Sequence, residues 1–128
     1  MAGELETIVR ATFDALGRAD ADAIMRYAAD DIQGIDEISR RWMRGRAEVG
    51  DYVKQLASAA SDVRSEMRDI HEVTWGDGGI LTFWLEQDYT LEGEREHISA
   101  PTTCVFRRAG SDWKMVLLKS IPLPVESA

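Results

Sequence analysis

The sequence predicts an α+β fold, with three helices packed in the concave face of a strongly curved, mainly antiparallel sheet. The first observation is a change of period: the first half has apolar residues at helical spacing, whereas residues 63–122 alternate as strands do. The second is that two segments, 80–91 and 100–118, are apolar on both alternating faces. Such a sheet needs cover on both sides. The helices supply one cover, and we expect a second copy of the protein, in a homodimer, to supply the other.

Composition indicates one domain, residues 1–128, with 45% hydrophobic and 30% charged residues. The net charge of -8 argues against nucleic acid or an anionic membrane surface as a partner. The single cysteine excludes an intramolecular disulfide. The first residues lack the basic and apolar regions of a secretory signal, and no apolar run approaches the roughly 20 residues that span a bilayer. We therefore expect a cytoplasmic protein that does not enter a membrane.

The first half contains three segments with helical spacing. Apolar residues recur at this spacing from Leu5 to Leu16, and Asp20 is placed to cap a second, short helix that continues to Ala28. The third helix, from Val49 to Ala60, has the clearest pattern. Between the second and third helices we expect a short irregular strand over residues 32–38 and a basic connection over residues 40–46.

Four strands follow, separated by turns at residues 76–79, 92–94 and 109–112. The first of them loses its alternation between Met67 and Val73, which predicts a bulge there. In the second strand, Phe83, Gln87 and Tyr89 share the face turned toward the helices. We place His97 and Thr103 of the third strand, and Leu117 and Lys119 of the fourth, on that same side. The opposite alternation predicts the outer, dimer-forming face: Ile80, Thr82, Trp84, Thr102, Cys104, Phe106, Val116 and Leu118.

The order of these elements resembles the nuclear transport factor 2-like (NTF2-like) superfamily. The segments that carry the resemblance are residues 43–49 (MRGRAEV), 103–108 (TCVFRR) and 113–116 (WKMV). The superfamily includes ketosteroid isomerases, scytalone dehydratases and SnoaL-like polyketide cyclases. It implies a cone-shaped α+β barrel with an apolar pocket in its mouth. On the last strand, where many SnoaL-like proteins have polar residues or histidines facing the pocket, this chain has Leu117, Lys119 and Ile121.

The resemblance makes Asp36 the candidate general base, because ketosteroid isomerase-like members have a proton-shuttling carboxylate near this point. Burial in an apolar cone raises the pKa of an aspartate and suits it to that role. Tyr89 and His97 are the candidate hydrogen-bond partners of a developing oxyanion. The alternatives are a solvated turn acid for Asp36, a surface histidine for His97, and a Tyr89 hydroxyl that reaches water.

The candidate ligand-binding residues are Trp42, Phe83, Gln87, Thr103, Leu117 and Lys119. Together they describe a mostly apolar pocket with a few polar anchors. Trp42 either closes over a ligand or covers the base of the cone. Lys119 either pairs with Asp36 or an anionic ligand, or extends to solvent at a strand end.

Three functions remain open from the sequence. One is a cofactor-independent isomerase, dehydratase or cyclase that works by proton transfer; the others are a non-catalytic ligand-binding module and a dimeric assembly module. We expect no metal, because two histidines and one cysteine lie in unrelated registers. We expect no cofactor, since the glycine-rich turn at 76–79 lacks the lysine and helix of a phosphate loop. Cys104, on an apolar face, is expected to be an inert thiol.

Overall fold

The computed structural model describes residues 3–36 and 40–121, and these form an α+β domain. The helices are α1 (Glu4–Gly17), α2 (Ala21–Ile24), the 3-10 helix η1 (Met25–Tyr27) and α3 (Arg46–Ala59). The strands are β1 (Ala28–Asp36), β2 (Arg41–Arg44), β3 (Ala60–Trp75), β4 (Gly78–Leu91), β5 (Glu94–Ala109) and β6 (Asp112–Ser120). The predicted fold class and element order are confirmed.

Two differences from prediction lie between the second and third helices. The second helix ends before Ala28, where β1 already begins, and residues 41–44 of the expected connection form strand β2. The strand expected over residues 32–38 is therefore the second half of β1, and its last residues, 37 and 38, lie outside the described part of the chain.

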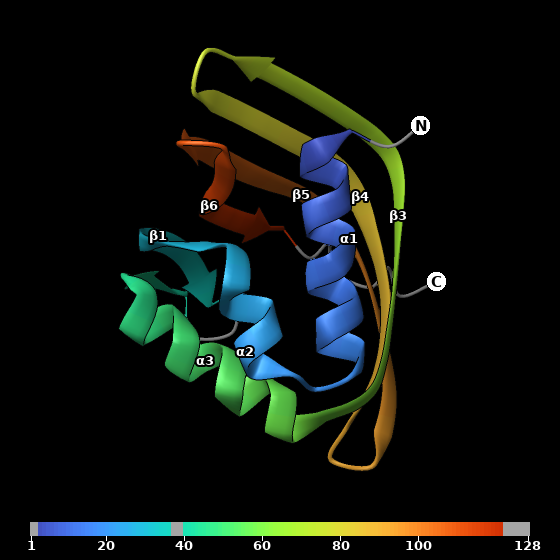
Figure 1. Cartoon of the computed structure of the whole chain (residues 1–128). Helices are drawn as coiled ribbons and strands as arrows, with labels where there is room; N and C mark the ends of the chain where they lie inside the picture. Colours follow the sequence, from blue (N-terminus) through green and yellow to red (C-terminus); the bar gives the residue numbers. More distant parts are fainter. Residues whose placement is uncertain (1–2, 37–39, 122–128) are drawn as a thin grey trace.

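The six strands form one sheet in the order β2-β1-β6-β5-β4-β3. All neighbours are antiparallel except β1 and β6, which are parallel. Figure 1 shows the long strands β3, β4 and β5 bending around α1, with α2 and α3 on the same concave side. The helices thus cover one face of the sheet, as predicted. No helix among the described residues is long and apolar enough to cross a membrane.

The core lies between α1 and the concave face of the sheet. Helix α1 turns Leu5, Val9, Thr12 and Ala15 inward, at the spacing that its sequence predicts. Opposite them, Leu81, Phe83 and Leu85 of β4 are at most 4% exposed. Burial of each large side chain of this kind stabilises the fold by about 1.5–3 kcal/mol. The inward face of β4 was therefore predicted correctly.

Polar contacts at helix N-termini fix how the helices begin. A carboxylate oxygen of Glu72 on β3 accepts a hydrogen bond from the backbone N–H of Glu6 at 2.8 Å, so an anion from the sheet satisfies the start of α1. The indole N–H of Trp113 on β6 donates to Glu4 at 2.7 Å. These two contacts hold the first turn of α1 against both β3 and β6. Asp20 caps α2 as predicted, accepting from the N–H of Ala23 at 3.1 Å.

The faces of β5 are the reverse of those predicted. In the observed register, Leu81 pairs with Cys104 and Phe83 pairs with Thr102, and paired residues share a face. Thr102, Cys104 and Phe106 are 2%, 0% and 1% exposed and belong to the core side, so their assignment to the outer face was wrong. Thr103 and Val105, expected inside, lie on the outer face opposite Thr82 and Ile80.

A bulge in β6 produces a second reversal. The β5–β6 register shifts between Val105 and Phe106: Phe106 pairs with Met115, but Val105 pairs with Leu117. Trp113 and Met115 are buried in the core, whereas Leu117 and Lys119 stand on the outer face with Val105 and Thr103. Leu118, expected outside, packs against the core. The bulge predicted in β3 is confirmed by the register shift between Arg68 and His71.

The outer face therefore has a different composition from the one predicted. A row of apolar side chains crosses four strands, because Val73 pairs with Ile80, Ile80 with Val105, and Val105 with Leu117. Trp84 and its partner Pro101 lie on the same face. We call this set the outer patch: Val73, Ile80, Trp84, Pro101, Val105 and Leu117. Of the residues predicted for this face, Ile80, Thr82 and Trp84 are confirmed.

Candidate functional site

Asp36 ends β1 on the concave side of the sheet. Ile32 and Gly34 are buried, and Asp36 follows two residues later on the same alternation, half-buried. Its backbone carbonyl accepts a hydrogen bond from the N–H of Arg40 at 2.8 Å, and it pairs with Arg41 across β2. Its side chain therefore belongs to the face of the sheet that carries the helices.

Two buried hydroxyls lie on the same side of the sheet as Asp36. The oxygens of Thr102 and Ser120 are 2.9 Å apart, and Thr102 also donates to the carbonyl of Ala100 at 3.2 Å. Thr102 is 2% and Ser120 is 9% exposed. Gly34 pairs with Leu118, so Asp36 and Ser120 each stand two residues beyond this parallel pair on their strands. The sequence analysis missed both hydroxyls because it placed Thr102 of β5 and Ser120 of β6 on the outer side of the sheet.

Gln87 and Tyr89 also face the concave side. The amide nitrogen of Gln87 donates to the hydroxyl of Ser65 on β3 at 3.0 Å. Both Gln87 and Tyr89 are half-buried. Phe83, a predicted ligand contact on the same face, is 3% exposed and packs edge-on against Phe13 of α1, with ring centroids 6.1 Å apart. Its side chain therefore serves the core.

The other predicted site residues lie on the opposite face of the sheet. The pairing of Asp88 with His97 places His97 beside Glu86 and Ser99 on the outer side, and Thr103, Leu117 and Lys119 follow the corrected faces of β5 and β6. The structure thus brings Asp36, Gln87 and Tyr89 to one face and separates them from His97. Lys119 cannot pair with Asp36 across the sheet.

Trp42 also points away from the concave side. On β2, Met43 pairs with Gly34 and packs against the core, so the neighbouring Trp42, paired with Ile35, projects from the other face. Trp42 is 43% exposed, and the guanidinium of Arg44 lies 5.9 Å from the centre of its ring. Trp42 therefore neither closes over the concave side nor covers the base of the cone.

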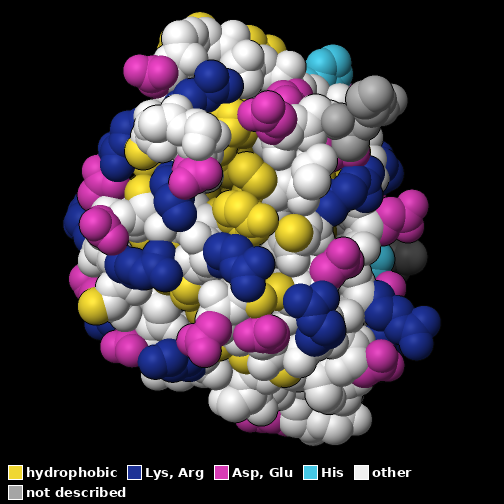
Figure 2. Space-filling view, viewed as in Figure 1, with side chains coloured by type: hydrophobic (Ala, Val, Ile, Leu, Met, Phe, Trp, Pro, Cys, Tyr) yellow, Lys and Arg dark blue, Asp and Glu magenta, His cyan; other side chains and the backbone are white. Residues whose placement is uncertain are grey.

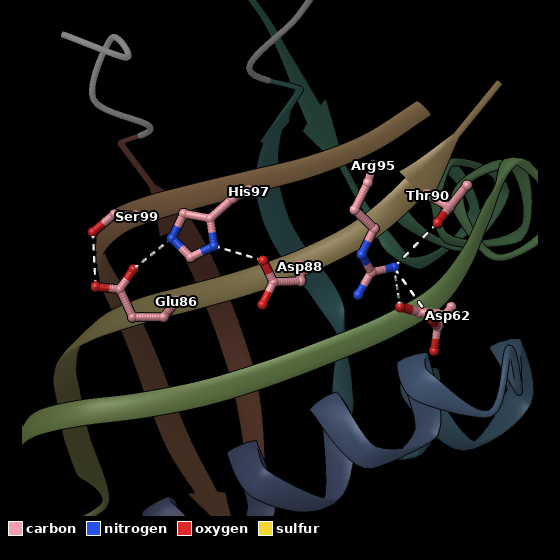
Figure 3. Close-up of polar contacts among 7 residues, drawn as sticks. All are labelled: Asp62, Glu86, Asp88, Thr90, Arg95, His97 and Ser99. Carbon is pink, nitrogen blue, oxygen red and sulfur yellow. Dashed lines mark hydrogen bonds and ion pairs between the residues drawn. The ribbon is translucent and has the colours of Figure 1, made fainter. Parts of the chain in front are cut away.

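A polar cluster occupies the outer face where β4 and β5 meet (Figure 3). His97 Nδ1 lies 2.7 Å from a carboxylate oxygen of Asp88, and Nε2 lies 3.3 Å from Glu86. Glu86 also accepts hydrogen bonds from Ser99 at 3.0 Å and Arg68 at 3.1 Å. The hydrogen bond to Asp88 is the main cause that raises the pKa of His97. Donation from Ser99, then from Arg68, lowers the pKa of Glu86.

Two hollows are lined by described residues. One, of about 270 Å³, lies across the outer face, with Thr82, Trp84, Thr103 and Lys119 in its lining. The other, of about 410 Å³, lies between the start of α1, η1 and the β5–β6 turn, and its lining includes Ile8, Tyr27 and Trp113.

The face that carries the helices shows hydrophobic side chains gathered near its middle, with charged side chains around them (Figure 2).

Cys104 and the acidic residues offer little further chemistry. Burial raises the pKa of the Cys104 thiol to about 12, so it is a poor nucleophile at neutral pH. Within residues 3–36 and 40–121, no group of three or more His, Cys, Asp or Glu side chains is arranged to hold a metal ion.

Comparisons with known proteins identify relatives by sequence pattern and by shape. The model of the SnoaL-like domain matches residues 5–124. A comparison with curated proteins gave no match. Among solved structures, an NTF2-like family protein from Streptomyces avermitilis is 17% identical with a TM-score of 0.84, and the alignment covers 95% of this chain and 96% of that one.

Two further structures share the fold. A ketosteroid isomerase-like protein from Erwinia carotovora atroseptica is 17% identical, with a TM-score of 0.79 and 94% of each chain covered. The S. rosetta CaMKII hub is 15% identical, with a TM-score of 0.79, and the alignment covers 96% of this chain and 99% of the hub. At these identities the likeness concerns the fold alone.

Proposed function

Because the chain belongs to the SnoaL-like domain family, we propose that it binds a small, largely apolar organic molecule on the concave face of its sheet, at the end that carries Asp36. The observation that carries this proposal is the set of polar side chains on this face of the sheet. Thr102 and Ser120 are buried beside an otherwise apolar core, and Gln87 is held by Ser65. A core needs no such hydroxyls for its packing, whereas a ligand site uses a few polar groups to orient its occupant.

In this proposal Asp36 is the general base of a proton-transfer reaction: isomerisation, dehydration or cyclisation. The carboxylate removes a proton next to a carbonyl or hydroxyl of the ligand and returns it at another position. Tyr89 is the hydrogen-bond partner of the oxygen that gains negative charge, because it lies on the same face and its hydroxyl is a donor. His97 has no part in this chemistry, since it lies on the other face.

The test uses 3-cyclohexenone, whose conversion to the conjugated enone requires only the removal and return of a proton and is followed by ultraviolet absorbance. The wild-type protein should accelerate it over buffer. Asp36→Asn keeps the shape of the side chain and removes the base, so the acceleration should fall by about 10²–10⁴-fold. Asp30→Asn, an exposed change on the same strand, is the control and should keep the wild-type rate.

Equal acceleration by the wild-type protein and Asp36→Asn would show that Asp36 is not the base. Binding is measured separately, from the fluorescence of 2-naphthol. Binding without acceleration in the wild-type protein would favour the non-catalytic ligand-binding module. Absence of both binding and acceleration would contradict the proposed site.

A second function, self-association, is favoured by the outer patch. Its row of apolar side chains crosses four strands, and no described segment of the chain covers it. We propose that a second copy of the protein packs sheet to sheet on this patch. The fold is shared with a protein named as a CaMKII hub, which is compatible with such packing.

A stable interface of this kind should bury about 1,200 Å² or more in total. Sedimentation velocity at micromolar concentration should show a dimer. Trp84→Glu should dissociate it, because the variant introduces an unpaired charge into the patch. Gln55→Glu adds the same charge to an exposed position of α3 and should leave the dimer intact. A wild-type protein that sediments only as a monomer would contradict this proposal.

A further inference from the structure

The polar cluster on the outer face contains a histidine between two carboxylates. His97 projects from β5 toward Asp88 and Glu86 of β4, with its two ring nitrogens directed at different carboxylates (Figure 3). A neutral imidazole carries one N–H, so it can donate to only one of these two acceptors. Only the imidazolium form, with a proton on each nitrogen, matches both. The geometry is therefore complementary to one charge state of His97.

Glu86 is the residue most affected by the other charge state. Its oxygen Oε2 is buried and has no hydrogen-bond partner among the described residues, although Nε2 of His97 lies 3.3 Å away. Its other oxygen accepts from Ser99 and Arg68, which hold the carboxylate in place. We assign the single proton of neutral His97 to Nδ1, because this nitrogen makes the shorter contact, 2.7 Å to Asp88. Nε2 then presents a lone pair to a buried carboxylate oxygen, which is an unfavourable contact.

This polar cluster is joined to the outer patch through Arg68. The guanidinium of Arg68 lies 3.0 Å from Glu86 and 5.2 Å from the ring centre of Trp84. A shift of Glu86 therefore removes the carboxylate that holds Arg68 over Trp84, a residue of the patch. His97, Glu86, Arg68 and Trp84 form a continuous series of contacts from a titratable group to the apolar surface.

The charges around His97 determine how its protonation changes the net charge of this part of the outer face. From β3 the cluster receives Asp62, Arg64, Glu66 and Arg68, from β4 Glu86 and Asp88, and from β5 Arg95. The β5–β6 pairing begins only at Thr102, so β6 does not reach this part of the face. Four carboxylates thus face three guanidinium groups. A protonated His97 makes the cluster neutral, and a deprotonated His97 leaves it negative on both copies of a dimer.

Building on the self-association proposed above, we propose that the proton on His97 controls this association: the outer patch pairs with a second copy while His97 is charged and releases it when His97 is neutral. Deprotonation of His97 has two consequences, and both weaken the association of the two copies. Glu86 loses a donor and Arg68 its anchor over Trp84, and the two copies then repel through like charges. Because Asp88 raises the pKa of His97, the transition lies above the usual histidine pKa of about 6.5.

The experiment measures the dimer dissociation constant by sedimentation equilibrium between about pH 6 and about pH 9, a range that begins near the usual histidine pKa of about 6.5 and extends above it. For the wild-type protein the constant should increase about tenfold or more across this range, the effect of one charge interaction. His97→Gln carries no titrating group and should remove the dependence. His71→Gln is the matched variant of the other histidine on the outer face, which pairs with Thr82 and lies 3.7 Å from Asp69 but makes no contact with Glu86 or Asp88 among the ion pairs of the described residues. It should keep the dependence.

Glu86→Gln provides a second, independent variant. Its carboxamide carries no charge, so deprotonation of His97 no longer faces a buried anion, and its dimer should depend less on pH than the wild type. A dependence that persists in His97→Gln, or a wild-type dissociation constant that does not change with pH, would overturn the role of His97 while leaving the dimer in place. A protein that is monomeric throughout the range would overturn both the dimer and its control by His97.

Discussion

The assignment of the two faces of β5 can be tested with two adjacent residues, Val105 and Phe106. Phe106 is 1% exposed and belongs to the core, so Phe106→Ala removes a fully buried aromatic ring and should lower the free energy of unfolding by about 3–5 kcal/mol. Val105 is half-buried on the outer face, and Val105→Ala should cost about 1 kcal/mol or less, since it removes two carbon groups that are worth about 0.8 kcal/mol each only when fully buried. The predicted loss in free energy of unfolding is therefore several-fold larger for Phe106→Ala than for Val105→Ala.

Urea denaturation followed by far-ultraviolet circular dichroism measures both values. A domain of this size has about 5–15 kcal/mol of stability, so Phe106→Ala should remove a large part of it. Measurements at two protein concentrations separate any contribution of self-association, which involves the outer face and hence Val105. Comparable losses for the two variants, or a loss below about 1 kcal/mol for Phe106→Ala, would refute the observed register of β4 and β5.

Three further predictions follow from individual contacts. Cys104 should resist alkylation by iodoacetamide in the native protein at pH 8 and react after unfolding, because burial raises the pKa of its thiol to about 12; rapid reaction of the folded protein would contradict this. Asp31 on β1 is paired with Arg107 of β5 at 2.9 and 3.1 Å, and the hydrogen bonds from Arg107 lower its pKa. Its ion pair therefore stabilises the fold above the unfolded-state pKa and is lost as pH falls through the lowered value. Asp31→Asn should be less stable than the wild type at neutral pH, and the urea midpoints of the two should converge in acid, whereas a constant difference would assign the effect to something other than charge. Thr102→Val leaves the buried hydroxyl of Ser120 without its partner and should cost about 1–3 kcal/mol in urea unfolding. Thr103→Val, the matched change on the outer face, should cost much less, and equal costs would contradict the separation of the two faces.

The helices and the inward face of β4 were predictable because both depend on local spacing. Leu5, Val9, Thr12 and Ala15 recur at helical intervals and are buried, and Leu81, Phe83 and Leu85 alternate and are buried. The polar end of β4 follows the same alternation, which placed Gln87 and Tyr89 correctly. These patterns require no knowledge of how one strand pairs with another.

The faces of β5 depend on the length of one turn. The prediction assigned residues 92–94 to the turn, whereas the observed turn has two residues, Glu92 and Gly93, and pairs Leu91 with Glu94. One residue more or fewer in a hairpin turn transfers every side chain of the next strand to the other face. Because β5 is apolar on both faces, its own alternation could not reveal the error. Cys104 and Phe106 were therefore exchanged with Thr103 and Val105.

β6 was misassigned for a different reason. Its bulge leaves Val116 between the pairs that join Met115 to Phe106 and Leu117 to Val105, so the strand changes face midway. Strict alternation from Trp113 and Met115 therefore predicts Leu117 and Lys119 on the wrong side. No residue near Val116 marks this bulge in the sequence, since neither glycine nor proline stands there. The error removed Ser120 from the candidate site and added Lys119 to it.

The corrected faces redistribute residues between the ligand site and the dimer surface, which the sequence analysis had already placed on opposite faces. On β5, Thr102 belongs to the concave side and Thr103 to the outer side; on β6, Ser120 and Lys119 divide in the same way. His97 is therefore not part of the proposed proton-transfer site, and it lies on the surface proposed to bind a second copy. Adjacent residues on the same strand therefore report on different functions. A change at Asp36 or Ser120 that alters association but not ligand binding, or the reverse at His97 or Trp84, would show that the sheet does not keep the two functions apart.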